Sequence, residues 1–408
     1  MLTRRTFAAM AASATAMTAV GTFGRARAAE PLKIGAVNPY SGGMALYGDE
    51  VTRCYELAAK QINAAKGGLL GRPVEIVRGN ATSAQEGIAA VEQLIGRDGV
   101  EILMGTYASS ISNAASEAAL NYGKLYWETN AVASNLTERG LPNFIRAGLA
   151  ADDFGRRSVE GALELVAKRL DKAPSEMSVW LEHEDSAYGT SIAEAQKRLL
   201  EEAGVTVGVG AHSFKSIDVT DSILRAKSAA PDLWISTGYV GDTNLLLRAA
   251  RDQGFAPPAI MSVGVGDTAE TLDALGAEYL EGVLLVSFPR ADISEDYGPG
   301  SDAFLELYRA EFGRDPVAPQ GMAAFVGAKI LFEAVEAAGS VEFDAVAEAA
   351  KAMDKPFGSY ETGYGARFDD TLQNTRAVPI IAQWQGGEVK AVYPPEAASS
   401  DVVNLPRA

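Results

Sequence analysis

The sequence predicts an α/β fold of two Rossmann-like lobes with parallel-rich sheets, and two features of the chain lead to this prediction. From Leu32 onward, short β-branched or apolar runs alternate with helical patterns, and repeated β-α units of this kind form parallel sheets with helices on both faces. The units are too many for one sheet, and the series begins again near Asp152. A chain of 408 residues with 47% hydrophobic content is long enough for two compact domains.

Eight short apolar runs are the expected strands. They cover residues 32–37, 74–78, 102–106, 125–128, 179–181, 233–237, 260–263 and 283–287. The clearest helical pattern between them covers residues 49–66, where Val51, Tyr55 and Ala58 recur at three- and four-residue spacing. Gly67 follows this pattern, as glycine does at the C-terminal end of many helices.

The chain is expected to cross between the lobes three times, near Gly148, Ser287 and Gly358. A strand ends before the first of these points, a long helical pattern covers residues 156–170, and a new β-α series begins at Val179. Lobe one then comprises residues 29–147 and 288–357, and lobe two comprises residues 148–287 and 358–395. Residues 396–408 are expected to form an extended or frayed C-terminal tail.

The first 28 residues have the composition of a cleavable export signal. Arg4 and Arg5 precede a weakly apolar stretch rich in Ala and Thr, and Ala26-Arg27-Ala28 is a small-x-small cleavage pattern. The arginine pair favours the twin-arginine route, with a general secretory signal as the alternative. The stretch is too polar for a permanent membrane span, so we expect a periplasmic protein without direct membrane insertion.

Composition excludes several classes of protein. With 36 Lys and Arg against 53 Asp and Glu, the formal charge is −17, which argues against nucleic-acid binding. Cys54 is the single cysteine, so neither an intrachain disulfide nor a cysteine zinc site can form. The two histidines, His183 and His212, are expected to be ordinary surface or loop residues, and no metal or cofactor is predicted.

Ser109 and Ser110 directly follow an expected strand and begin a helical pattern. One interpretation is a cradle for an anion, because the first turn of a helix offers unpaired N–H groups at the carboxyl end of parallel strands. Another is that one serine simply caps its helix. A catalytic nucleophile is the least favoured, since no Gly-x-Ser-x-Gly turn surrounds Ser109 and both histidines lie in the other half of the chain.

Nucleotide-binding motifs are also missing from the sequence. There is no Gly-x4-Gly-Lys-Ser/Thr loop, and the stretch VGVGD that contains Gly264 lacks the third glycine of a dinucleotide fingerprint.

Longer stretches resemble a known family. The opening IGAVNPYSGG from Ile34, Tyr47-Gly48 and AKQINAAKGGLLGRPV from Ala59 look like the start of the type I periplasmic binding proteins, specifically the leucine/isoleucine/valine-binding family of ABC importers. The likeness continues in order through the rest of the mature chain, in Ser109-Ser110, NAVASNLT from Asn130, Tyr188-Gly189, Gly238-Tyr239 and EGVLL from Glu281.

The resemblance implies a ligand held between two lobes that close about three crossovers. Ser109, with Ser110 beside it, would bind a ligand carboxylate through its hydroxyl and nearby backbone N–H groups. Asn130, Ala131 and Val132 would add backbone contacts. The aromatic walls would be Tyr47 and Tyr107 from lobe one and Tyr188 and Tyr239 from lobe two.

Two positions depart from the family pattern. Val132 stands where a Ser or Thr is common, and Gly264 stands where amino-acid binders tend to supply a Glu for the ammonium group. A buried ammonium needs an acceptor or a counter-charge, and Glu128, Asp242 and Asp267 are the remaining candidates.

We therefore expect a non-enzymatic periplasmic protein that delivers a small carboxylate to the permease of an ABC importer by hinge closure. The expected ligand is an amino acid or a related aromatic or aliphatic acid, with one carboxylate, an apolar body and an optional α-ammonium. A ligand-sensing receptor subunit on the same fold is the first alternative, and an exported α/β hydrolase is the second.

Overall fold

The computed structural model describes residues 29–407, and the predicted export signal at residues 1–28 lies outside them. The first sheet has five parallel strands in the order β2-β1-β3-β4-β5. These strands are β1 (Leu32–Asn38), β2 (Val74–Asn80), β3 (Ile102–Gly105), β4 (Leu125–Glu128) and β5 (Phe144–Arg146).

The second sheet has seven strands in the order β12-β11-β10-β9-β8-β6-β7, and all its neighbours are parallel except the pairs that β11 makes. Together the two sheets confirm the predicted α/β fold with parallel-rich sheets, and every expected strand is present. The second sheet contains β6 (Ser178–Glu184), β7 (Thr206–His212), β8 (Leu233–Thr237), β9 (Ala259–Val263), β10 (Leu284–Ser287), β11 (Ile380–Gln385) and β12 (Glu388–Tyr393).

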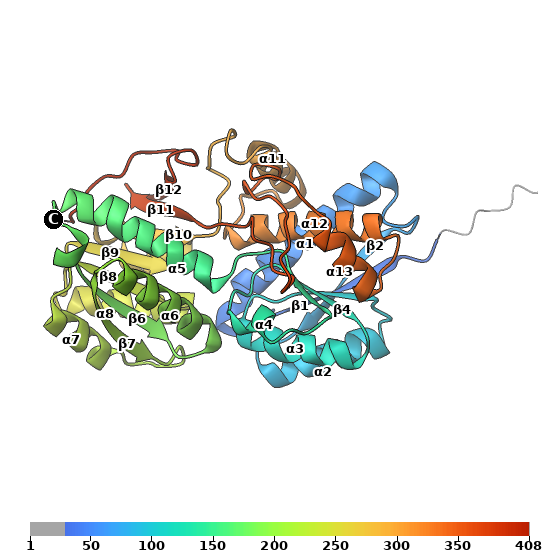
Figure 1. Cartoon of the computed structure of the whole chain (residues 1–408), viewed down its shortest axis with the longest axis horizontal. Coiled ribbons are helices and arrows are strands. Elements are labelled where there is room, and N and C mark those ends of the chain that lie inside the picture. The colour runs from blue at the N-terminus through green and yellow to red at the C-terminus, as the bar shows by residue number, and fades with distance from the viewer. Residues whose placement is uncertain (1–28, 408) are drawn as a thin grey trace, which may run out of the picture. The chain divides into compact units, whose positions relative to one another are not determined.

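Helices flank both sheets (Figure 1). Those beside the first sheet are α1 (Ala45–Lys66), α2 (Ala84–Gly96), α3 (Ser109–Asn121), α4 (Asn135–Glu138), α11 (Ser301–Phe312), α12 (Gln320–Ala338) and α13 (Phe343–Lys351). Those beside the second sheet are α5 (Ala151–Glu160), α6 (Ala187–Glu202), α7 (Thr220–Ala229) and α8 (Val240–Asp252). Two short helices complete this set: α9 (Ala269–Leu275) contacts α8, and α10 (Ala277–Leu280) contacts α9 and β11. Among residues 29–407, none of the helices combines the length and the apolar character needed to cross a bilayer.

Helices that are far apart in the sequence pack together in the first lobe. Helix α1 packs against α12, far apart in the sequence but side by side in Figure 1. The Tyr308 hydroxyl of α11 donates to the buried Glu50 carboxylate of α1 at 2.7 Å. Helix α1 ends at Gly67, whose φ of 74° is the left-handed conformation expected for this glycine.

The long helix expected over residues 156–170 is helical but not uniform. Helix α5 is followed directly by a π-helical segment, Gly161–Ala167. A Cβ at Gly161 would lie 2.8 Å from side-chain atoms of Ile381 and Met261. The wider turn therefore begins where the helix backbone lies against the second sheet, which an apolar-spacing pattern cannot show.

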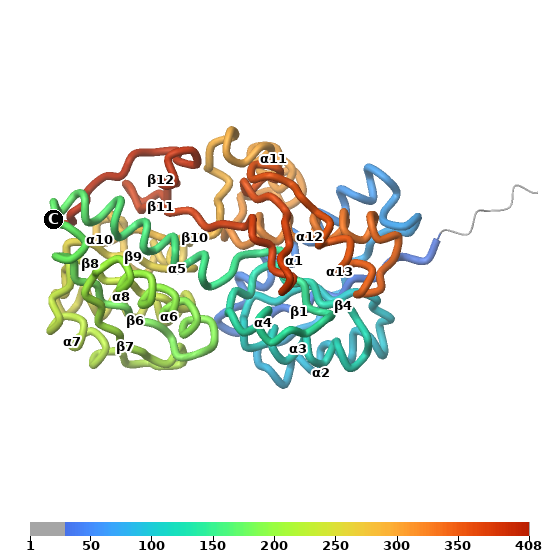
Figure 2. The backbone as a smooth tube through the Cα atoms, viewed as in Figure 1, coloured from blue at the N-terminus to red at the C-terminus, as the bar shows by residue number. Residues whose placement is uncertain are grey.

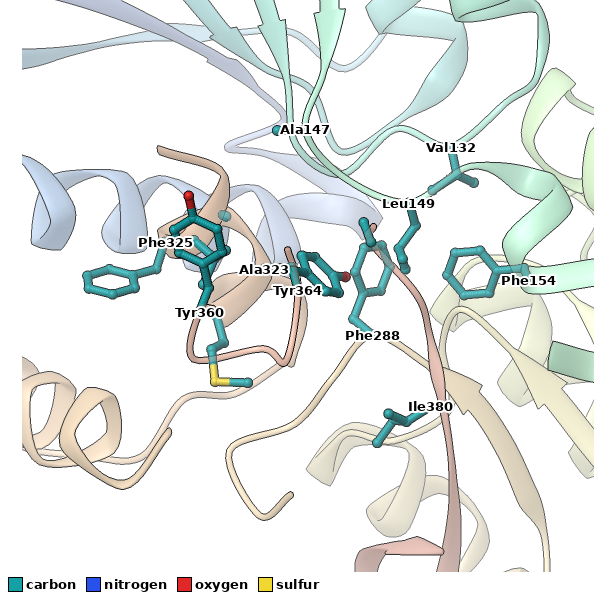
Figure 3. Close-up of a cluster of buried hydrophobic side chains, with 14 of the residues drawn as sticks. Val132, Ala147, Leu149, Phe154, Phe288, Ala323, Phe325, Tyr360, Tyr364 and Ile380 are labelled. Atoms are coloured by element: carbon teal, nitrogen blue, oxygen red, sulfur yellow. The ribbon is translucent and has the colours of Figure 1, made fainter. Parts of the chain in front are cut away.

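Three segments that connect the lobes pack in one buried cluster. Leu149 follows β5, Phe288 follows β10, and Tyr364 precedes β11, and all three belong to the same core (Figure 3). Phe154 at the start of α5 meets Phe288 edge-on, with 5.5 Å between ring centroids. The red C-terminal part of the tube, with β11 and β12, lies beside the green and yellow strands of the second sheet in Figure 2.

The exact lobe bounds stay a prediction, and one contact bears on them. Gln373 pairs with Arg146 of β5, and the Arg146 N–H donates to the Leu372 carbonyl at 3.0 Å. Residues near 373 thus lie on the first sheet, which favours a third crossover closer to residue 377 than to Gly358.

The C-terminal segment is extended and is held by hydrogen bonds. The Val403 N–H donates to Gln383 Oε1 at 2.9 Å, and the Arg407 N–H donates to the Pro258 carbonyl at 2.9 Å. Of the two expectations for this tail, residues up to 407 therefore agree with an extended segment and not with a frayed one.

Candidate functional site

The four tyrosines predicted for the site lie together between the two sheets. The rings of Tyr47 and Tyr107, from the first lobe, stack with centroids 4.8 Å apart and an interplanar angle of 6°. Tyr107 lies 6.0 Å from Tyr239 of the second lobe, and Tyr239 lies 5.2 Å from Tyr188. The tyrosine cluster, defined as these four residues, therefore joins both lobes through aromatic contacts.

The tyrosine hydroxyls differ in their partners. The Tyr188 hydroxyl donates to the Val263 carbonyl at 3.2 Å. The Tyr47 hydroxyl is buried and pairs with the Thr268 side chain. Burial is the main cause that raises the pKa of all four phenols, so these rings are neutral at physiological pH.

Gly264 packs against the tyrosine cluster. Its φ is +80°, and a Cβ at this position would overlap the Tyr188 hydroxyl. The Gly264 carbonyl accepts from Gln320 Nε2 at 2.9 Å. An acidic side chain at residue 264, where the family pattern favours one, has no room in this structure.

Ser109 is buried at the start of α3, and its oxygen accepts from the Ala133 N–H at 3.2 Å. The helix N-cap is Ala108, so the alternative interpretation, in which Ser109 or Ser110 caps α3, is wrong. Ser110 is exposed. Because Ser109 uses an acceptor lone pair for Ala133, its hydroxyl hydrogen remains available for a ligand.

The backbone N–H groups of Asn130 and Ala131, which were expected to contact a ligand, are hydrogen-bonded to the side chain of Glu128. Glu128 is fully buried, and its Oε1 accepts from the N–H groups of Thr129, Asn130 and Ala131 at 2.9, 3.0 and 3.0 Å. Its Oε2 accepts from the Thr106 N–H at 2.7 Å and from the Ser112 hydroxyl. Burial raises the pKa of Glu128 to about 7, although these hydrogen bonds oppose the rise.

The hydrogen bonds of Glu128 contradict two expectations. The N–H groups of Asn130 and Ala131 are bound to its carboxylate, and the carboxylate has no free side for a ligand ammonium. Val132, which follows Asn130 and Ala131, is buried. Its carbonyl accepts from the N–H of Ala151, at the start of the second lobe, at 2.8 Å.

Asp242, the second acid considered as a counter-charge, is also occupied. His212 Nε2 lies 3.0 Å from Asp242 Oδ2, and Asp242 Oδ1 accepts from the Tyr239 N–H at 3.0 Å. His212 Nδ1 lies 3.3 Å from Glu182 Oε1, at ion-pair distance but without hydrogen-bond geometry. Burial lowers the pKa of His212, but the two carboxylates outweigh it and raise that pKa to about 9.

Asp267 is the acid with an open oxygen. Its Oδ2 accepts from the Ser287 hydroxyl at 2.7 Å and lies 3.6 Å from Arg290 Nη1. Its Oδ1 is buried and has no hydrogen-bond partner among residues 29–407.

Gln320 is a site residue that sequence reasoning missed. It is fully buried, its backbone carbonyl accepts from Asn130 Nδ2 at 3.1 Å, and its side chain reaches Gly264. It thus connects Asn130 of the first lobe with the second. A single Gln at the start of an apolar helix gives no signal of this role.

No histidine activates Ser109 in the described part of the chain. His212 is held by Asp242 and Glu182 in the second lobe, and His183 Nδ1 lies 2.9 Å from the Glu184 carbonyl oxygen. Neither histidine forms a Ser–His pair with Ser109 in this geometry.

Comparison with known proteins agrees with this geometry. Residues 31–388 match the family model described as "Periplasmic binding protein". The chain belongs to the periplasmic binding protein family. This binding protein is 35% identical to the Leu/Ile/Val-binding protein homolog 7 of Brucella suis over 381 residues, which cover 93% of this chain and 95% of the relative.

Two solved structures share the fold of this binding protein. A leucine-binding protein from Thermotoga maritima superposes with a TM-score of 0.76 at 21% identity and covers 88% of this chain and 97% of its own. A solute-binding protein of an ABC transporter from R. palustris, in complex with 4-hydroxybenzoate, superposes with a TM-score of 0.75 at 20% identity. That alignment covers 92% of this chain and 98% of the R. palustris chain. These likenesses confirm the two-lobed type I architecture.

Proposed function

We propose that this protein binds a small carboxylate between its lobes in the periplasm and delivers it to the permease of an ABC importer. The tyrosine cluster carries the proposal, because rings from both lobes meet there and a ligand between them would contact both lobes at once. Export by a cleaved signal in residues 1–28 belongs to the same proposal, as does the absence of catalysis.

Ser109 is the proposed carboxylate donor. It follows Tyr107 by two residues, is buried, and has its hydroxyl hydrogen uncommitted. The flat faces of Tyr47, Tyr107, Tyr188 and Tyr239 suit an apolar or aromatic body. Leucine and 4-hydroxybenzoate, named for the two solved relatives, both place one carboxylate on such a body.

The test compares an acid with its neutral amide. A thermal-shift screen of leucine, phenylalanine, benzoate and 4-hydroxybenzoate selects the strongest acid, and calorimetry then measures that acid and its amide on the mature protein. We expect the acid to bind at least tenfold more tightly, a difference of about 1.4 kcal/mol.

Ser109→Ala should weaken binding of the acid by roughly 1.5–3 kcal/mol, the range for a hydrogen bond to a charged group, and change amide binding little. Ser228→Ala, an exposed serine of α7, is the matched control and should change neither. Failure of all four acids to bind would contradict the proposal, as would equal affinity for acid and amide.

A further inference from the structure

Arg146 is a buried guanidinium on β5 that the proposed function does not use. It is 1% exposed, and burial lowers its pKa to about 10, so it is charged at neutral pH. The carboxylates of Glu128 and Asp153 favour this charge, but neither forms an ion pair with Arg146 in the described part of the chain. A buried charge without a counter-ion is unfavourable unless hydrogen bonds compensate for it, so the acceptors of Arg146 indicate its role.

Two of these acceptors are backbone carbonyls of residues 131–133. Arg146 Nη1 donates to the Ala133 carbonyl at 2.8 Å and to the Ala131 carbonyl at 3.3 Å. Arg146 Nη2 donates to the Thr137 hydroxyl at 3.3 Å. The planar guanidinium therefore holds both ends of residues 131–133 at once, in an arrangement that a single ammonium group does not reproduce.

Residues 131–133 also hold the proposed carboxylate donor. The Ala133 N–H donates to Ser109 Oγ at 3.2 Å, so the residue whose carbonyl faces Arg146 also contacts the Ser109 hydroxyl. Because this bond uses one lone pair of the hydroxyl, the position of Ala133 limits the directions in which the hydroxyl hydrogen can point. One residue therefore connects Arg146 to Ser109.

Gln373 holds the other side of the guanidinium. Arg146 Nε donates to Gln373 Oε1, and Gln373 Nε2 donates to the carbonyls of Gly148 at 2.9 Å and Asn374 at 2.8 Å. Gly148 lies where the chain leaves β5 for α5, and Gln373 precedes β11 of the second sheet. The guanidinium is thus bonded to the segments through which the chain passes between the two sheets.

Val132 makes a further bond to the first of these segments. Its carbonyl accepts from the Ala151 N–H at the start of α5, and its side chain belongs to the buried cluster of Figure 3 together with Leu149 and Phe154. All three carbonyls of residues 131–133 therefore accept from β5 or from the start of α5. The position of this stretch depends on where the chain passes from the first sheet to the second.

We propose that Arg146 is a positioning residue for ligand binding, which holds residues 131–133 so that the Ser109 hydroxyl points at the carboxylate of the ligand. Gln373 orients the guanidinium, and Arg146 itself does not touch the ligand. The inference rests on the proposed carboxylate function and adds to it a residue that acts through Ser109.

A double-mutant cycle tests whether Arg146 acts through Ser109. Arg146→Lys keeps the charge but not the fork, and calorimetry on the full mature chain compares the strongest acid of the screen with its amide. We expect acid affinity to fall roughly three- to tenfold, the loss of about one hydrogen bond, while amide affinity changes by less than about twofold. In the Ser109→Ala background, Arg146→Lys should change acid affinity by less than about twofold, because the group that it positions is gone.

Arg139→Lys is the matched control. Arg139 Nη1 donates to the Asn113 carbonyl at 2.8 Å in the same lobe, but Arg139 makes no hydrogen bond to residues 131–133 among the described residues. This variant should keep the wild-type affinity for both acid and amide. A loss of stability common to the two arginine variants, measured by urea unfolding, would then not explain a loss of acid affinity in Arg146→Lys alone.

Each other outcome overturns the proposal and identifies what failed. Unchanged acid affinity in Arg146→Lys would show that the fork does not position Ser109, and additive losses in the double variant would show that Arg146 acts elsewhere. Equal losses in the two arginine variants would show a general effect of the substitution. A wild-type protein that binds no acid, or binds acid and amide equally, would overturn the carboxylate function itself and this inference with it. If Arg146→Lys does not fold, Gln373→Met decides: the ratio of acid to amide affinity falls by roughly threefold or more, or the proposal is wrong.

Discussion

At the residue scale, Tyr188 and Gly264 depend on one another. The Tyr188 hydroxyl fills the place where a side chain at residue 264 would begin, and the left-handed φ of Gly264 is itself unfavourable for other residues. Gly264→Ala should therefore destabilise the protein by roughly 2–4 kcal/mol through overlap and backbone strain, measured by urea unfolding.

The matched variant is Tyr188→Phe, which removes only the hydroxyl. In the double variant, the overlap is relieved but the strain at residue 264 remains, so roughly half of the lost stability should return. Additive effects of the two changes would show that the hydroxyl does not limit residue 264.

At the element scale, β6, β7 and α8 are joined by the buried ion network of Glu182, His212 and Asp242. The folded-state pKa of His212, about 9, lies above the ordinary value of 6.5. The network therefore contributes fully below pH 6.5, and its contribution is lost as pH rises through about 9. The free energy of unfolding should fall over this window by on the order of 3 kcal/mol.

Urea unfolding between pH 6 and pH 10 checks this dependence. His212→Gln should lower stability at pH 6 and flatten the decline. His183→Gln changes the other histidine, which is on β6. This variant should retain the wild-type slope, because the His183 ring bonds to the Glu184 carbonyl and not to a carboxylate of the network. A wild-type slope that survives in His212→Gln would place the dependence in another group.

A helix or strand could be predicted from the sequence where a local pattern of residues was enough to specify it. The strands buried on both faces were recognisable as apolar runs, but β7 was not, because Gly208 and Gly210 interrupt an edge strand whose burial is low. The hairpin of β11 and β12 turns at Gly386-Gly387, a glycine pair that is a local signal for such a turn. The pairing of Gln373 with Arg146 joins residues 227 positions apart and has no local pattern.

The same division applies to the candidate site. The four tyrosines and Ser109 were predicted by family resemblance, and the structure brings the tyrosines together. The occupation of the Asn130 and Ala131 N–H groups by Glu128 could not be predicted, since it depends on how the backbone folds back at the end of β4. The open oxygen of Asp267 depends in the same way on Ser287 and Arg290, which are distant in sequence.

At the scale of the whole molecule, the lobes are already in contact. Tyr107 lies against Tyr239, the Ser134 N–H donates to Ser191 Oγ at 3.3 Å, and Gln320 Nε2 donates to the Gly264 carbonyl. Tyr47 and Ala318 of the first lobe also pack in one buried apolar cluster with Val240 and Val265 of the second, so opening about the crossovers exposes this surface. A ligand that binds both lobes favours the closed arrangement by its differential affinity for it.

Small-angle scattering should therefore give a smaller radius of gyration when the strongest acid of the screen is added at saturation. Its amide at the same concentration is the control and should leave the profile unchanged. Gln320→Ala removes one contact of the closed form without touching a tyrosine, so its free form should be more open and its change on binding larger. An unchanged radius of gyration with saturating acid, in the wild-type protein and in Gln320→Ala alike, would show that ligand binding does not close the lobes.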